Sequence, residues 1–433
     1  MNIIPFPDRA DWPTLLARPV QSTGQIEAVV APILAQVKTE GDTALRSLAL
    51  KFDKVDLTVD GLHVSEAELD GAESQLSDEL KSAIRQAYQN IRLFHERQQQ
   101  PVEKIETMPG VTCWRKSVGI EKVGLYIPGG TAPLFSTVLM LGIPAQLAGC
   151  REIVLCTPGS HPAIYFAAKL VGVTKVFRIG GAQAIAAMAY GTESVPQVYK
   201  IFGPGNQYVT AAKMLVAKEG VAIDMPAGPS EVAVYADDSA VPAFVAADLL
   251  SQAEHGSDSQ VLLVSTSKKL ISCVNLTLST QLARLPRQAM AAKALENSRM
   301  ILVETQTDAI DLLNAYAAEH LILSVENAEA VADQIYNAGS IFLGNYTPES
   351  AGDYASGTNH TLPTNGFARA YSGVSLDSFV KKITLQHITP EGLQNVGPVV
   401  EAMAEAESLD AHKRAVSLRL ASLTETNPVS NPV

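Results

Sequence analysis

The sequence predicts an α/β protein with two blocks of parallel strands that lie between helices. Short apolar runs rich in β-branched residues alternate with helical stretches from about residue 123 to residue 344. Uninterrupted apolar strands in such an alternation are typical of parallel sheets that are buried on both faces. A break rich in Pro and Gly, M-P-A-G-P-S at 225–230, separates the two blocks. A small N-terminal arm and a C-terminal helical segment complete the expected fold.

The composition of the chain disfavours several classes of protein. The 433 residues carry 45 acidic and 33 basic side chains, a net charge of −12, which disfavours binding to nucleic acid. Four scattered cysteines are too few for the disulfide framework of a secreted domain. The first residues lack the pattern of a signal peptide, and the most apolar span, 136–150, is too short to cross a bilayer. We therefore expect a cytoplasmic protein with no nucleic-acid or membrane partner.

A region with helical periodicity follows the N-terminal arm. Residues 1–22 form the expected arm, and the pattern is helical over about 25–99. Ser65 and Glu68 fit a capping box, in which each side chain accepts a hydrogen bond from a free backbone N–H at a helix start. Between 80 and 94, apolar residues recur at spacings of four and three, which predicts an amphipathic helix.

Nine strands are expected beyond this helical region. They are 123–127, 152–156, 175–179, 198–202, 231–235, 260–264, 300–304, 321–325 and 340–344. We assign 123–229 to one α/β domain, and 23–122 together with 230–375 to the other. Within the second domain, 345–375 is dense in Gly, Ser, Thr, Asn and Pro and reads as a long functional loop. Residues 376–433 form the expected C-terminal helical segment.

Three glycine-rich turns follow predicted strands: I-P-G-G-T at 127–131, I-G-G-A-Q-A at 179–184 and F-G-P-G-N at 202–206. Glycine lets a backbone approach a ligand closely, and the helix that follows offers free N–H groups to an anion. None of the turns fits the dinucleotide fingerprint G-x-G-x-x-G. Each alone is equally consistent with a tight turn. Three at the carboxyl ends of neighbouring strands favour a ligand site, because open α/β sheets bind ligands there.

Two short motifs carry side chains that could bind a metal ion or transfer protons. Gln252 and His255 are three residues apart near a helix end, so they share a face and could offer an oxygen and a nitrogen to one metal ion. A capping or surface role fits that spacing as well. Glu319 and His320 stand where a helix gives way to a strand, and such a pair could divide two proton transfers between them. The dipeptide alone is common and carries little weight.

Further candidates lie toward the C-terminus. The long loop supplies Asp353 and His360, and a late helix supplies Glu407 and His412. None of these pairs has zinc-finger or H-E-x-x-H spacing. The cysteines flanking the second strand lie in apolar surroundings that disfavour a reactive thiolate, so we interpret all four as packing residues. Residue patterns alone thus indicate an α/β enzyme with a candidate metal site.

Taken together, the motifs resemble one family, histidinol dehydrogenase. The matching runs are G-L-Y-I-P-G-G-T-A-P-L-F-S-T-V-L-M, G-G-A-Q-A-I-A-A, K-I-F-G-P-G-N, D-M-P-A-G-P-S-E-V, S-Q-A-E-H-G, E-H-L and P-E-S-A-G-D-Y-A-S-G-T-N-H. They occur in the family's order, and they extend across most of the chain.

The resemblance implies an oxidoreductase of histidine biosynthesis. Such an enzyme uses NAD and one Zn²⁺ per subunit to oxidise L-histidinol through L-histidinal to L-histidine, a four-electron reaction in two steps. The fold would be Rossmann-like and similar to aldehyde dehydrogenases, which explains the missing fingerprint. In that fold, 123–229 would bind NAD, and 23–122 with 230–375 would bind substrate and zinc.

Residue roles also follow from the resemblance. The implied zinc ligands are Gln252, His255, Asp353 and His412. His320 would be the general base for the alcohol proton, and Glu319 would activate the water that attacks the aldehyde. The implied substrate contacts are Ser230, Gln252, His255, His320, Asp353, His360, Glu407 and His412. The implied NAD contacts are Tyr126, Gln183 and Asn206.

The resemblance further implies a homodimer with shared active sites, in which the C-terminal segment brings His412 and Glu407 to the partner's site. Two other functions stay open at this point. One is a related zinc- and NAD-dependent dehydrogenase of another amino alcohol. The other is a non-catalytic regulator that binds NAD or histidine, which would be expected to have lost a ligand or a base; every expected residue is present here.

Overall fold

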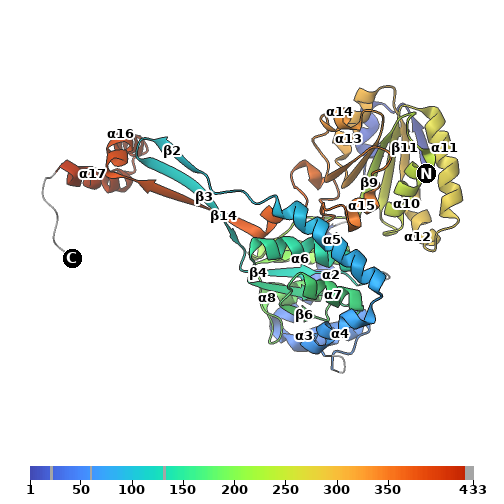
Figure 1. Ribbon diagram of the computed structural model, residues 1–433, viewed down its shortest axis with the longest axis horizontal. Helices are drawn as coiled ribbons and strands as arrows, with labels where there is room; N and C mark the ends of the chain where they lie inside the picture. Colours follow the sequence, from blue (N-terminus) through green and yellow to red (C-terminus); the bar gives the residue numbers. More distant parts are fainter. Residues whose placement is uncertain (20–22, 59–60, 130–132, 425–433) are drawn as a thin grey trace. The chain divides into compact units, whose positions relative to one another are not determined.

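The structure, a computed structural model, forms two units (Figure 1). The first unit contains Met1–Gln98 and Gly119–Phe379, and the second contains Gln99–Val118 and the chain from Val380 onward. The structure describes residues 1–19, 23–58, 61–129 and 133–424. Two of its sheets are wholly parallel, so the predicted α/β class is confirmed.

One parallel sheet of the first unit is built by the predicted strands of the first block. Its order is β6-β5-β4-β7-β8, and every neighbouring pair is parallel. The strands are β4 (Lys122–Tyr126), β5 (Glu152–Cys156), β6 (Lys175–Phe177), β7 (Lys200–Phe202) and β8 (Ala222–Ile223). The chain moves outward from β4 and then returns to its other side with β7. This switch point leaves a crevice at the carboxyl ends of β4 and β7.

Helices cover both faces of this sheet. One face carries α2 (Thr23–Glu40), α3 (Asp42–Leu48), α8 (Gly181–Tyr190) and α9 (Gln207–Lys218). The other carries α4 (Glu66–Ala72), α5 (Asp78–Glu96), α6 (Phe135–Ala148) and α7 (Pro162–Leu170). The predicted capping box is confirmed at the start of α4, where Ser65 and Glu68 cap each other's backbone N–H.

The helices between residues 23 and 99 therefore pack on the five-stranded sheet, whereas the sequence predicts a grouping of 23–122 with 230–375. The physical reason is that the apolar face of α2 meets α8 and α9, and that of α5 meets α6. Short helical turns at Arg9–Asp11, Ala49–Asp53 and Glu73–Gln75 connect these elements.

The second parallel sheet of the first unit has the order β1-β11-β10-β9-β12-β13. Its strands are β1 (Asn2–Pro5), β9 (Glu231–Ala236), β10 (Gln260–Ser265), β11 (Arg299–Leu302), β12 (His320–Ser324) and β13 (Ser340–Leu343). Successive side chains of a strand point to opposite faces. Accordingly, Val232 and Val234 enter one hydrophobic core while Ala233 and Tyr235 enter the other.

Two helix layers enclose this sheet, as Figure 1 shows for α10 to α12 and for α13 and α14. The first layer is α10 (Pro242–Ala253), α11 (Lys268–Leu282) and α12 (Gln288–Glu296). The second is α1 (Trp12–Leu15), α13 (Gln306–Tyr316) and α14 (Ala328–Ala332). The expected N-terminal arm is part of this layering: β1 pairs with β11, and Trp12 and Leu16 are buried in the second core. Residues 20–22 of that arm lie outside the described residues.

The stretch 345–375, predicted as a loop, contains α15 (Glu349–Tyr354) and a 3₁₀ turn at Phe367–Arg369, followed by another at Leu376–Phe379. Distant elements fix it. Asn90 donates a hydrogen bond to the Ala355 carbonyl at 2.8 Å, and Asn359 donates to the Met140 carbonyl at 2.6 Å. Such long-range bonds leave no local pattern in the sequence.

The second unit holds a three-stranded sheet of order β14-β3-β2 and two helices. Its elements are β2 (Lys104–Met108), β3 (Val111–Gly119), β14 (Val380–Ile388), α16 (Pro390–Ala406) and α17 (Asp410–Thr424). The segment predicted as helical, 376–433, therefore begins with a nine-residue strand, and 425–433 lie outside the described residues. The strand forms because β3, far away in sequence, supplies its hydrogen-bonding partner. Within the described part of the chain, no helix has both the length and the apolar character that crossing a membrane requires.

Candidate active site

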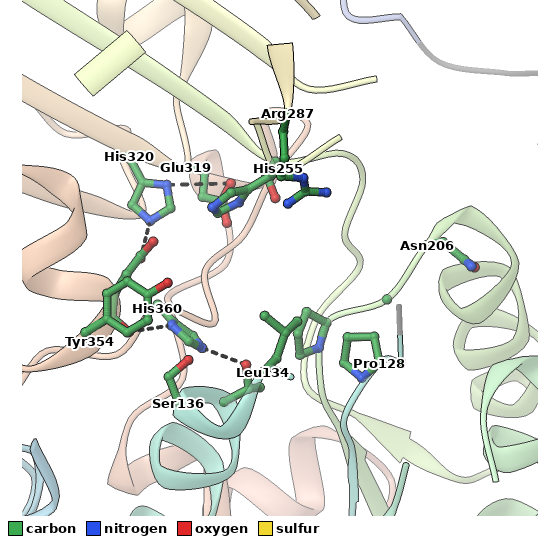
Figure 2. Close-up of a pocket in the computed structure, with 16 residues that line it drawn as sticks. Pro128, Leu134, Ser136, Asn206, His255, Arg287, Glu319, His320, Tyr354 and His360 are labelled. Carbon is green, nitrogen blue, oxygen red and sulfur yellow. Dashed lines mark hydrogen bonds and ion pairs between the residues drawn. The ribbon is translucent and has the colours of Figure 1, made fainter. Parts of the chain in front are cut away.

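A cavity of about 420 Å³ opens in the first unit where the two parallel sheets present loop residues to each other (Figure 2). The five-stranded sheet contributes Pro128 after β4 and Asn206 after β7. The six-stranded sheet contributes Ser230 before β9, and Glu319 and His320 at the start of β12. The cavity thus joins the carboxyl ends of one sheet to the amino ends of the other.

Two of the three predicted glycine turns reach this cavity. Pro128 and Gly129 line it from the first turn, whose Gly130 and Thr131 lie outside the described residues, and Gly205 lines it from the third. The second turn, at 179–184, is not among the described residues that line the cavity.

A buried ion pair fixes the third turn. Lys213 donates from Nζ to the Gly203 carbonyl at 2.9 Å, while Asp224 accepts the Gly203 N–H at 2.8 Å. Lys213 and Asp224 also contact each other, with side chains that are 4% and 1% exposed. Gly203 has φ +133°, and a Cβ at this position would collide with the Tyr126 carbonyl. The backbone that leads to Asn206 is therefore held rigidly.

The predicted NAD contacts occupy different environments. Asn206 lines the cavity and caps α9, accepting the N–H groups of Tyr208 and Val209. Gln183, in the second turn, and Tyr126, at the end of β4, are both buried. The Tyr126 hydroxyl accepts the Gly181 N–H at 3.1 Å, and burial raises the pKa of Tyr126 to about 12. Gln183 donates to the Asp53 carboxylate at 3.2 Å.

His320 is surrounded by carboxylates. Its imidazole is 4% exposed, with Nδ1 at 3.7 Å from Glu319 Oε2 and 3.8 Å from Glu349 Oε1. Nε2 lies 3.5 Å from Asp353 Oδ1. Burial lowers the pKa of His320, but the three negative charges outweigh burial and raise that pKa to about 10. The neighbouring carboxylates therefore favour the protonated form of the imidazole.

The two glutamates of this cluster are strongly perturbed. Burial raises the pKa of Glu319 to about 8, opposed by the charge of His320 and by the Glu231 N–H, which donates to Glu319 Oε2 at 2.9 Å. Burial also raises the pKa of Glu349 to about 8. Clusters of shifted carboxyl groups in a cavity are typical of sites that transfer protons.

The predicted metal ligands of the first unit lie beside His320. Gln252 is fully buried, its Oε1 has no partner, and its Nε2 lies 3.1 Å from His255 Nδ1. His255 faces the cavity, and one ligand atom each from His255, Glu349 and Asp353 lie within 4.8 Å of one another. Desolvation by surrounding protein lowers the pKa of His255, which favours the neutral imidazole that metals bind. This set of oxygen and nitrogen donors suits zinc.

His360 lines the cavity between Asp353 and α6. Its Nδ1 lies 2.9 Å from the Asp353 carbonyl, and its Nε2 lies 3.1 Å from Thr137 Oγ1. Because a carbonyl can only accept, Nδ1 carries the proton, and the neutral ring accepts the Thr137 hydroxyl at Nε2. Burial lowers the pKa of His360, in agreement with a neutral ring. Figure 2 shows this ring facing the cavity below His320.

The other predicted site residues, Glu407 and His412, belong to the second unit. Glu407 ends α16, and His412 lies in the first turn of α17. Both side chains are exposed to solvent.

Comparison with known proteins identifies the family. The family model described as histidinol dehydrogenase matches residues 16–420. The chain belongs to the histidinol dehydrogenase family. It is 62% identical to a histidinol dehydrogenase of Bacteroides thetaiotaomicron over 98% of this chain and all of the relative, and 53% identical to one of Yersinia pestis over 94% and 93%. The crystal structure of histidinol dehydrogenase from Elizabethkingia anophelis matches with a TM-score of 0.95 and 54% identity, over 98% of this chain and 99% of that one. The predicted family is confirmed, and the enzyme is an oxidoreductase.

Sequence reasoning missed several residues of this histidinol dehydrogenase site. Glu349 precedes Asp353 by four residues, a helical spacing that would have linked the two had 345–375 not been interpreted as a loop. Arg287 lines the cavity from the turn between α11 and α12, a position that only the tertiary structure reveals. Arg18 and Glu231 are separated by more than two hundred residues and form an ion pair.

That ion pair lies at the start of β9, the strand that pairs with β12. Arg18 donates from Nε and Nη2 to the two oxygens of Glu231 at 2.6 and 2.9 Å, and to the Tyr316 carbonyl at 2.7 Å. The guanidinium also lies 4.0 Å from the centre of the Tyr316 ring. Glu231 is 1% exposed, and its backbone N–H holds Glu319. The N-terminal arm thus anchors the residue that fixes one active-site carboxylate.

Replacing Arg18 by methionine should lower the free energy of unfolding by about 3–5 kcal/mol, because it leaves the buried Glu231 charge without a partner. The double variant Arg18→Met/Glu231→Gln should lose less, since both charges are then absent. Denaturation with urea measures both differences. An Arg18→Met variant as stable as the unaltered enzyme would show that the pair is not needed to compensate Glu231.

Proposed function

We propose that the enzyme oxidises L-histidinol to L-histidine through L-histidinal, the last step of histidine biosynthesis, with NAD as the acceptor and one zinc ion per subunit. The observation that carries this proposal is the buried imidazole of His320 beside Glu319, Asp353 and the cavity. The overall change is one alcohol, two NAD⁺ and one water converted to one carboxylate, two NADH and three protons.

Gln252, His255, Asp353 and His412 would hold the zinc ion. The unpartnered, buried Oε1 of Gln252 supports this assignment, because a buried acceptor without a partner is costly unless a ligand satisfies it. When bound, zinc supplies positive charge that orients the substrate and lowers the pKa of neighbouring groups. Ser230, His360 and Glu407 would complete the contacts to the substrate.

His320 would take the proton of the substrate hydroxyl in the first oxidation. This role needs the neutral imidazole, which the positive charge of a bound zinc ion would favour. It faces the cavity from the first position of β12, so the strand fixes its backbone. NAD, bound by the 123–229 region with contacts from Tyr126, Gln183 and Asn206, supplies the hydride acceptor in both oxidations. Hydrogen bonds hold Tyr126 against the turn of Gln183 and fix the turn before Asn206, which favours a preformed cofactor site.

Glu319 would take a proton from the water that attacks the aldehyde, giving the hydrate that is oxidised next. Its raised pKa supports this role, because a carboxylate with a higher pKa is a stronger base. No thiolate is required. Burial raises the pKa of Cys150 to about 12 and that of Cys156 further, and neither is among the described residues that line the cavity.

We further propose a cytoplasmic homodimer in which the second unit of one subunit completes the active site of its partner. Apolar side chains of this unit, Val399 and Met403 on α16 and Leu418 on α17, are exposed, and such faces are typical of protein interfaces. Glu407 and His412 lie next to them in the chain and are accessible to a partner. The net charge of −12 and the four free cysteines agree with a cytoplasmic enzyme that does not bind nucleic acid.

Purified enzyme should contain about one zinc ion per chain, as a four-ligand site requires. Asp353→Asn should reduce the zinc content, because it removes a charged ligand, whereas Asp258→Asn, which alters an exposed carboxylate near His255, should not. Elemental analysis after dialysis measures the content. Full activity in enzyme stripped of zinc by a chelator would contradict the assignment.

His320→Asn should lower kcat for histidinol by about 10²- to 10⁴-fold with little change in KM, because a proton acceptor acts in the transition state. Glu319→Gln should slow oxidation of histidinal more than oxidation of histidinol. Steady-state assays with each substrate measure both effects, with Glu326→Gln as a control on the exposed turn after β12. If Glu319→Gln slowed both half-reactions equally, the division of roles would be wrong.

A further inference from the structure

We propose that Glu349 is a positioning residue that holds the imidazole of His320 in its reactive orientation from the side away from the cavity. This inference rests on the proposed role of His320 as the base. It adds a residue that none of the sequence motifs singled out for a role.

One short helix places a carboxylate at each nitrogen of the His320 ring. Glu349 and Asp353 are four residues apart on α15, so their side chains lie on one face of the helix. Glu349 Oε1 lies 3.8 Å from Nδ1, and Asp353 Oδ1 lies 3.5 Å from Nε2. A ring attracted at both nitrogens by the same helix resists rotation about its Cβ–Cγ bond. The spacing of α15 therefore selects one orientation of the ring.

Glu349 differs from the other carboxylate near Nδ1. Glu319 lines the cavity, and its Oε2 is already held by the Glu231 N–H. Glu349 is 1% exposed and is not among the described residues that line the cavity, so a substrate in the cavity would meet His320 instead. Glu349 would thus act through the imidazole and not on the substrate.

The surroundings of Glu349 also indicate which group its negative charge stabilises. Its Oε2 is buried without a hydrogen-bond partner, and a buried carboxylate is costly unless an opposite charge lies nearby. The His320 ring, whose Nδ1 lies 3.8 Å from the other oxygen of Glu349, can carry that opposite charge. The attraction works in both directions, so Glu349 stabilises the imidazolium that forms when His320 takes the alcohol proton. A neutral amide at this position would lose that stabilisation while keeping the shape.

A competing role is metal ligation, since an oxygen of Glu349 lies within 4.8 Å of ligand atoms of His255 and Asp353. The two roles predict different measurements. Loss of a ligand lowers the zinc content, whereas loss of a positioning group lowers kcat in an enzyme that retains its zinc and its substrate affinity.

The test is a double-mutant cycle with Glu349→Gln, His320→Asn and the combined variant, measured with histidinol at high enzyme concentration. Glu349→Gln should lower kcat by about 10- to 100-fold, with KM and zinc content unchanged. In the His320→Asn background, the same substitution should change kcat by less than about twofold, because Glu349 would act only through the missing ring. Glu349→Asp, which keeps the charge, should recover part of the loss.

Asp248→Asn is the matched control. Asp248 lies on α10 and is partly buried, which raises its pKa to about 7. It is a second perturbed acid whose charge acts on Glu349, and it makes no ion pair with His320 in the described structure. Its kcat should stay within about twofold of the unaltered enzyme. An equal loss in Asp248→Asn would mean that any buried charge matters, which would overturn the positioning role.

Three other results would also overturn it: unchanged kcat in Glu349→Gln, loss of zinc in that variant, or an equal factor in both backgrounds of the cycle. Failure of the proposed role of His320 as the base would give different results. If His320→Asn kept full activity, the assignment of the base would fail whatever Glu349 did. If His320→Asn lowered kcat and Glu349→Gln left kcat unchanged, only the positioning role of Glu349 would fail.

Discussion

A charge removed from water must be compensated by an opposite charge or by hydrogen bonds, and this constraint organises the active site. Arg18 compensates Glu231, and the backbone of Glu231 holds Glu319. Glu319 in turn lies against His320, whose second nitrogen faces Asp353. The N-terminal arm and the catalytic cluster are therefore linked by a continuous series of compensated charges.

The two sheets contribute different kinds of group to their shared cavity. The amino ends of β9 and β12 carry buried acids and an imidazole, while the carboxyl ends of β4 and β7 supply glycine turns with accessible backbone. On the glycine side, the Lys213–Asp224 pair holds the turn before Asn206. One sheet thus contributes ionisable side chains to the cavity, and the other contributes turns whose backbone is held by hydrogen bonds. Burial raises the pKa of the Cys150 and Cys156 thiols, and neither residue is among the described residues that line the cavity.

Hydrophobic periodicity predicted the inner strands well, because a strand buried on both faces is apolar throughout: 152–156 and 260–264 coincide with β5 and all but the last residue of β10. It missed β1 and β14, since each depends on a partner far away in the sequence, β11 and β3. The pair Glu319–His320 carried little weight as a dipeptide and gained it from the family motifs around it. Glu349 was missed because the Gly- and Ser-rich composition of 345–375 outweighed the helical spacing of Glu349 and Asp353. The hydrogen bonds of Asn90 and Asn359 that hold this segment in place join residues far apart in the sequence.

We propose that one cavity carries out both oxidations, with His320 and Glu319 dividing the proton transfers. The most direct measurement is the amount of NADH formed per histidinol consumed by the purified enzyme, together with the identity of the product. We expect two NADH and L-histidine, without accumulation of the aldehyde. One NADH per histidinol with histidinal released to solution would contradict it.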